Sequence, residues 1–133
     1  MEILALDVGS KRVGMARAST KARLAEPLKT VKTEEAIKQL QAMIKENDIM
    51  AIVIGLPRNL SGEDTPQTRW LRDWASRAKT QLGIPLYWQD EALTTQVAEV
   101  RHQDEKIHDV DALAAAVILQ DFLTTAKTDR VLV

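Results

Sequence analysis

The sequence contains no cysteine, which excludes a disulfide framework, a thiolate zinc site and a cysteine nucleophile. It also lacks a long apolar run, because the longest one, residues 49–56, is far too short to span a bilayer. No basic leader precedes Asp7, so we expect no signal peptide. These absences together lead us to expect a cytoplasmic protein with no membrane partner.

An excess of positive charge is also missing, since the formal net charge of the chain is −1. Proteins that bind nucleic acid usually carry a basic surplus, so the overall charge alone argues against such a partner. The distribution of charge argues the other way. Lys and Arg residues gather within positions 11–23, whereas acids dominate around positions 99–111. A local basic face is therefore compatible with the sequence.

No repeat, low-complexity tract or linker rich in proline and glycine divides the chain. Its 133 residues suit one domain and can bury a core without covalent cross-links. We therefore expect a single domain over residues 1–133.

The pattern of apolar residues predicts an α/β fold with a five-stranded mixed sheet. The predicted strands cover about residues 3–6, 13–18, 25–31, 49–54 and 84–89. Short links between the first three favour an antiparallel meander, and the later two are expected to be parallel. The predicted helices cover about residues 33–47, 65–83, 95–103 and 109–126, with Thr33 and Thr65 as caps and Gly83 as a terminator. We expect these helices to cover both faces of the sheet.

Acidic residues stand at the predicted strand ends. Asp7 closes the first strand and Asp90-Glu91 follows the last, and ligands of open α/β sheets bind beyond the carboxyl ends of parallel strands. Strand alternation sends Asp90 and Glu91 to opposite faces, so we expect only one of them to join Asp7. Asp111 opens the last helix and is placed to reach the same crevice, although an acid there is also favoured by helix capping and the helix dipole.

Three converging carboxylates repel one another unless a cation or protons neutralise them. Oxygen ligands without histidine or cysteine suit Mg²⁺ or Mn²⁺. Two such ions about 4 Å apart can activate a water molecule and stabilise the leaving oxygen of a phosphodiester. The acids therefore predict metal-dependent hydrolysis of a phosphodiester.

Basic residues lie next to two of the predicted strands. The segment 9–14 has the glycine spacing of a P-loop, but it lacks the Lys-Ser/Thr pair after the second glycine, so a Walker site is rejected. Lys11 and Arg12, and also Arg58 beside Pro57, are candidate contacts to phosphate, because lysine and arginine dominate such contacts. For Lys11 and Arg12, the alternative is a hairpin turn with exposed basic side chains.

Four blocks, in this order along nearly the whole chain, resemble the YqgF-type (RuvX) family of ribonuclease H-like proteins. The blocks are Leu6-Asp7-Val8-Gly9-Ser10-Lys11-Arg12-Val13-Gly14, Ile52-Val53-Ile54-Gly55-Leu56-Pro57, Asp90-Glu91-Ala92-Leu93-Thr94-Thr95, and Asp111-Ala112-Leu113-Ala114-Ala115 with Ile118-Leu119-Gln120. The resemblance implies a ribonuclease H-like fold and an acidic triad of Asp7, Glu91 and Asp111. It also implies a cytoplasmic nuclease that processes the 5′ end of pre-16S rRNA, with pre-ribosomal particles as partners.

Other functions stay open at this stage. Cleavage of Holliday junctions in DNA is one, and it requires a symmetric dimer for paired cuts, whereas an RNA-processing enzyme can be a monomer or a homodimer. A nucleic-acid-binding module without catalysis is another, because Ala92 replaces the arginine usual in the family and residues 101–110 are less basic than in the family. An actin-like phosphotransferase is disfavoured, since it needs two such domains.

Overall fold

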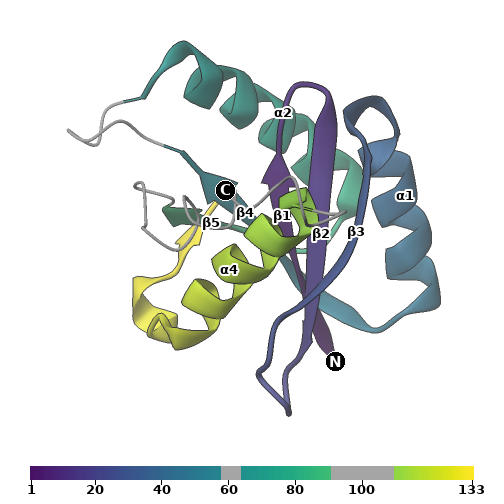
Figure 1. Ribbon diagram of the computed structural model, residues 1–133, viewed down its shortest axis with the longest axis vertical. Coiled ribbons are helices and arrows are strands. Elements are labelled where there is room, and N and C mark those ends of the chain that lie inside the picture. The colour runs from purple at the N-terminus through teal and green to yellow at the C-terminus, as the bar shows by residue number, and fades with distance from the viewer. Residues whose placement is uncertain (58–63, 91–109) are drawn as a thin grey trace.

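Six strands form one sheet in the order β3-β2-β1-β4-β5-β6. The computed structural model describes residues 1–57, 64–90 and 110–133. The strands are β1 (Glu2–Val8), β2 (Arg12–Ser19), β3 (Glu26–Lys32), β4 (Ile49–Leu56), β5 (Leu86–Asp90) and β6 (Val131–Leu132). The helices in the described part of the chain are α1 (Thr33–Glu46), α2 (Pro66–Leu82) and α4 (Val110–Thr124), as Figure 1 shows.

The strand directions confirm the predicted mixed sheet. β1, β2 and β3 form an antiparallel meander, and β1, β4 and β5 run parallel to one another. The carboxyl ends of these three parallel strands therefore share one edge. The prediction of five strands was one too few, because β6 pairs antiparallel with Tyr87 and Trp88 of β5. The predicted helix over residues 95–103 lies outside the described residues.

Strand alternation sorts the side chains of the sheet onto two faces. In β1, Leu4 and Leu6 belong to the core that includes residues of α1 and α2, whereas Ile3 and Ala5 belong to the core formed with α4. Figure 1 shows α4 lying across one face of the sheet. Helices on both faces are therefore confirmed. Asp7 continues the series of Ile3 and Ala5, so its side chain belongs to the α4 face.

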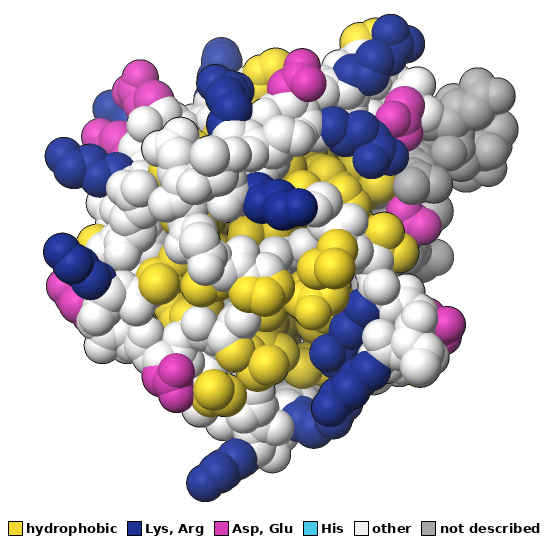
Figure 2. Space-filling model, turned by 180° about the vertical axis from the view of Figure 1, so that it is seen from behind, with side chains coloured by type: hydrophobic (Ala, Val, Ile, Leu, Met, Phe, Trp, Pro, Cys, Tyr) yellow, Lys and Arg dark blue, Asp and Glu magenta, His cyan; other side chains and the backbone are white. Residues whose placement is uncertain are grey.

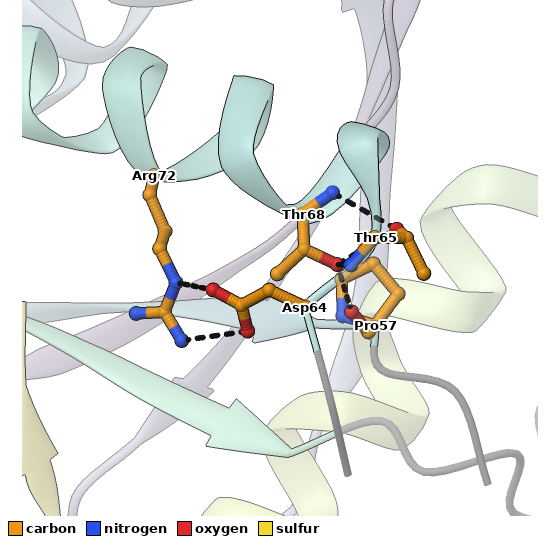
Figure 3. A network of polar contacts seen from close by, with 5 residues as sticks. All are labelled: Pro57, Asp64, Thr65, Thr68 and Arg72. Carbon is orange, nitrogen blue, oxygen red and sulfur yellow. Dashed lines mark hydrogen bonds and ion pairs between the residues drawn. The ribbon is translucent and has the colours of Figure 1, made fainter. Parts of the chain in front are cut away.

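The start of α2 is fixed by a reciprocal cap. The Thr68 backbone N–H donates to the Thr65 hydroxyl at 3.2 Å, and the Thr65 backbone N–H donates to the Thr68 hydroxyl at 3.2 Å. The Thr68 hydroxyl donates in turn to the carbonyl of Pro57 at 2.7 Å, and this ties α2 to the end of β4 (Figure 3). At the other end, Gly83 adopts a left-handed conformation with φ 70°, as its predicted role requires.

The face turned away from α4 has a mixed surface. Figure 2, viewed from behind Figure 1, shows apolar side chains in its centre with Lys, Arg, Asp and Glu side chains scattered around them. The partly buried apolar residues packed on the core of this side are Leu28, Val31, Ile37, Met43, Ile44, Trp70, Ile84, Trp88 and Val133. Within the described residues, no helix combines the length and apolar character needed to cross a bilayer.

Candidate active site

A pocket of about 350 Å³ opens where β1 ends and α4 begins. It is lined by Asp7, Val8, Gly9, Ser10, Lys11, Arg12, Gln67 and Asp111. These residues come from β1, the turn into β2, the start of β2, the first turn of α2 and the first turn of α4. Four of the six residues predicted for the site, Asp7, Lys11, Arg12 and Asp111, therefore meet in one place.

Backbone hydrogen bonds hold the turn between β1 and β2. The Gly9 N–H donates to the carbonyl of Arg12 at 2.8 Å. From α1, the Thr33 hydroxyl donates to the carbonyl of Gly9 at 2.6 Å, and the Thr33 N–H donates to the carbonyl of Lys11 at 3.0 Å. The prediction that Thr33 caps α1 was therefore wrong: Lys32 occupies the N-cap position, and the Thr33 hydroxyl is engaged by the turn.

Asp7 and Asp111 reach the pocket from different elements on the same face of the sheet. Asp7 is half-buried in β1 and lies opposite Gly14 of β2. The start of α4 packs closely over this strand pair, because a Cβ on Gly14 would lie only 2.1 Å from the backbone oxygen of Asp111. The glycine thus permits an approach that brings the first turn of α4 beside Asp7.

Arg12 and Asp111 form the ion pair of the pocket. The Arg12 Nε lies 3.2 Å from the Asp111 Oδ2, and the Arg12 side chain is 68% exposed while that of Asp111 is 26% exposed. An ion pair with one partner this exposed contributes little to folding stability. Its effect is local, since it places a positive charge beside a carboxylate at the mouth of the pocket.

Asp90 is excluded from this group of acids. It lines a different pocket, with Arg72 of α2 and Trp88 among its neighbours. Leu86 and Trp88 of β5 pack with the core that includes α1 and α2, and Asp90 continues that alternation, away from Asp7. The predicted residues Glu91 and Arg58 lie outside the described residues.

One residue that lines the pocket was not predicted from the sequence. Gln67 lines the pocket and was missed, although the Thr65-Pro66 signal located the helix start that carries it. Trp74 is 4% exposed and belongs to the core. Trp88 lies beneath the guanidinium of Arg72, whose carbon is 5.6 Å from the ring centroid. The side-chain hydrogen bond to Asp64 raises the pKa of Arg72, so this cation stays charged at all physiological pH values.

Comparison with known proteins identifies the family of this chain. A family model described as "RuvX: Holliday junction resolvase" matches residues 1–125. The chain belongs to the RuvX family. A relative from Roseiflexus sp. (strain RS-1), named "Putative pre-16S rRNA nuclease", is 34% identical over 94% of this chain and 95% of its own length. A relative of the same name from Lactobacillus johnsonii is 31% identical over 98% of this chain and 100% of its own length.

Solved structures identify the fold of this RuvX protein as RuvC-like, within the ribonuclease H-like class. Thermus thermophilus RuvC in complex with a Holliday junction substrate has a TM-score of 0.62, with 15% identity and full coverage of both chains. The fowlpox virus Holliday junction resolvase has a TM-score of 0.53, with 10% identity over 92% of this chain and 98% of its own. At these identities the likeness concerns the fold alone.

The donor atoms of this RuvX pocket suit a hard divalent cation. Asp7 and Asp111 supply carboxylate oxygens, and none of the described residues that line the pocket is a histidine or a cysteine. The Arg12 guanidinium offsets part of the negative charge of these carboxylates through its ion pair with Asp111. No group of three or more acidic, histidine or cysteine residues placed to hold a metal occurs in the ranges 1–57, 64–90 and 110–133. A third acid, as predicted at Glu91, would complete such a group.

Proposed function

We propose that this RuvX protein is a metal-dependent nuclease that hydrolyses phosphodiester bonds at the pocket of Asp7 and Asp111, with pre-16S rRNA as its substrate. One observation carries the proposal: two carboxylates far apart in the sequence line one pocket together with Lys11 and Arg12. Acids at the centre and cations beside them are the combination that phosphodiester hydrolysis needs. The proposed substrate places the activity in the cytoplasm, on pre-ribosomal particles.

The proposed roles follow from the chemistry of each side chain. Asp7, Asp111 and, from sequence, Glu91 would hold Mg²⁺ or Mn²⁺, and such ions when bound lower the pKa of water and stabilise charge on the leaving oxygen. Lys11 and Arg12 would orient the phosphate by direct contact. Gln67 also lines the pocket, and its side-chain amide would donate to the same phosphate. It stands in the first turn of α2, where the helix dipole also favours an anion.

The relatives favour RNA over branched DNA. Both relatives described above carry the rRNA name and are aligned over nearly their whole lengths. Cleavage of Holliday junctions is kept as the second candidate, because the family model carries that description and the fold is that of RuvC. For this second activity a symmetric dimer would be required, so that two active sites cut opposed strands.

The test is a cleavage assay with three labelled substrates: precursor 16S rRNA, unrelated single-stranded RNA and a four-way DNA junction. Each is incubated with Mg²⁺, with Mn²⁺ and with chelator. We expect cleavage of the precursor that needs metal and is lost in Asp7→Asn and in Asp111→Asn while binding persists. The matched control is Asp73→Asn, an exposed acid on α2. Cleavage confined to the junction would favour the resolvase, and binding without any cleavage would favour a non-catalytic module.

A further inference from the structure

A second pocket, of about 310 Å³, lies at the opposite end of α4 from the first. It is lined by Arg23, Gln120, Leu123, Thr124, Thr125, Ala126, Lys127 and Arg130. Three of these eight residues are cationic, two carry hydroxyl groups and none is acidic. Both threonine hydroxyls donate to the carbonyl of Asp121. The cationic side chains are therefore the ones that suit an anion, because arginine and lysine donate to phosphate oxygens.

Arg130 lines this pocket, and its guanidinium includes a donor without a partner among the described residues. Its Nε is buried and has no hydrogen-bond partner among the described residues. The guanidinium lies over the ring of Phe122, with its carbon 4.2 Å from the ring centroid, so an aromatic face rather than an acceptor holds it in place. A buried charged donor without an acceptor is costly, and an anionic oxygen would remove that cost.

Capping of α4 accounts for only part of this cluster. The Arg23 guanidinium donates to the carbonyl of Leu123 in the last turn of α4, across a sequence separation of 100 residues. This is a normal role for a cation at the negative end of a helix. Within the described residues the Lys127 ammonium makes no hydrogen bond or ion pair, and the Arg130 guanidinium packs on the ring of Phe122 with its Nε unpaired. Helix capping therefore leaves two of the three cations unexplained.

We propose that this second pocket binds a backbone phosphate of the nucleic-acid substrate, as an anchor separate from the catalytic pocket. The identity of the ligand as nucleic acid rests on the proposed function, whereas the anion-binding character of the pocket rests on its own residues. The 15 residues of α4 make a helix roughly 22 Å long. Asp111 stands in its first turn and the second pocket at its last. A 12-base-pair duplex is longer than this helix even if its rise is somewhat below the roughly 3.4 Å per base pair of B-form DNA, so one duplex is long enough to reach both pockets.

The first arm of the test measures binding without cleavage. A labelled 12-base-pair RNA duplex is titrated with the protein in chelator at several salt concentrations. For Lys127→Gln we expect weaker binding, whatever the duplex sequence, and a salt slope reduced by about one, as for the loss of one phosphate contact. Lys127 is exposed, so this variant is expected to fold normally. The matched control is Lys38→Gln, an exposed lysine on α1 at the opposite face of the sheet, which should bind with the wild-type slope.

The second arm uses inorganic phosphate and follows the Arg130 Nε–H resonance by NMR. We expect both phosphate and the duplex to shift this resonance, with smaller shifts in Lys127→Gln. A shift with phosphate but an unchanged duplex slope in Lys127→Gln would overturn the nucleic-acid anchor in favour of a site for free phosphate. No shift with either probe would overturn the proposal altogether.

The two proposals can fail separately. If the wild type cleaves none of the three substrates but Lys127→Gln still lowers the salt slope, the anchor stands and the nuclease falls. If cleavage is lost in Asp7→Asn but Lys127→Gln binds like the wild type, the nuclease stands and the anchor falls.

Discussion

Gly14 of β2 lies directly against the backbone of Asp111, and a Cβ atom at this position would stand 2.1 Å from the Asp111 carbonyl oxygen and 2.7 Å from the backbone nitrogen of Ala112. Backbone on both sides of the contact leaves no flexible side chain to move away. The glycine therefore sets how near α4, and with it Asp111, comes to Asp7. Gly14 therefore determines part of the geometry of the acidic pocket, the pocket lined by Asp7 and Asp111, although glycine has no reactive side chain.

Gly14→Ala should therefore lower stability and displace Asp111 together. We expect a loss of about 1–3 kcal/mol in the free energy of unfolding, the usual cost of overpacking a tight contact, measured by urea denaturation. Cleavage, assayed well below the unfolding transition, should fall at least tenfold. The control is Gly83→Ala, which meets no atom within 4 Å but places alanine at φ 70°. It should be destabilised by about 1 kcal/mol with wild-type cleavage. Equal activities in the two variants would contradict the positioning role.

Arg12→Gln should change metal affinity and nucleic-acid affinity in opposite directions. The Arg12 guanidinium pairs with Asp111 at 3.2 Å, so its removal frees a carboxylate oxygen for a cation. Mg²⁺ should then bind up to about fivefold more tightly, because an exposed ion pair is worth up to about 1 kcal/mol. Titration calorimetry without nucleic acid measures this. Binding of RNA in chelator should weaken, since a phosphate contact is lost.

The control for Arg12→Gln is Arg17→Gln on the same strand. Arg17 lies 3.9 Å from Glu2 and 3.8 Å from Glu26, and it does not line the acidic pocket. This variant loses ion pairs of a similar kind but should leave Mg²⁺ affinity unchanged. Unchanged affinity in Arg12→Gln as well would show that the guanidinium does not compete with the cation.

Thr68→Val tests the link between β4 and the start of α2. Thr68 is fully buried, and its hydroxyl donates to Pro57 while accepting from Thr65, as Figure 3 shows. Valine leaves these backbone groups without a partner, so we expect a loss of about 1–3 kcal/mol in the free energy of unfolding by urea denaturation. Thr80→Val removes a hydroxyl that donates to the carbonyl of Ser76 on the exposed side of the same helix, and it should cost less than about 0.5 kcal/mol.

The sequence allowed the acidic pocket to be predicted because its signals are local and repeat with the period of a strand or a helix. Asp7 closes an apolar strand and Asp111 opens an apolar helix, and the parallel order of β1, β4 and β5 brings such ends together. The same reasoning could not find Gln67, because no pattern in α2 indicates which of its first residues faces another element.

The features that were missed depend on long-range contacts. β6 is a strand of two exposed residues, too short for any alternation to show, and it exists only through its pairing with β5. The second pocket needs Arg23, in the turn after β2, to meet the end of α4 about a hundred positions later. Thr33 was misassigned as a cap for the same reason, since its hydroxyl bonds to Gly9 and not to its own helix.

Asp121 gives a prediction for the dependence of stability on pH. Burial raises the pKa of this carboxyl above its ordinary value of 3.8, and the residue stands in the last turn of α4, where the helix dipole also disfavours negative charge. Because the folded-state pKa is raised, the folded protein binds more protons than the unfolded chain between the two pKa values, and stability falls as the pH rises through that window.

Asp121→Asn should remove this loss of stability. At pH 7 we expect the variant to be more stable by about 0.3–1 kcal/mol, measured by urea denaturation, with the gain shrinking as the pH is lowered toward 3.8. The control is Asp129→Asn, which changes an exposed acid in the 3₁₀ turn that follows α4, and it should show no such gain. A gain for Asp121→Asn that is constant from neutral to acidic pH would assign the effect to helix propensity instead of to charge.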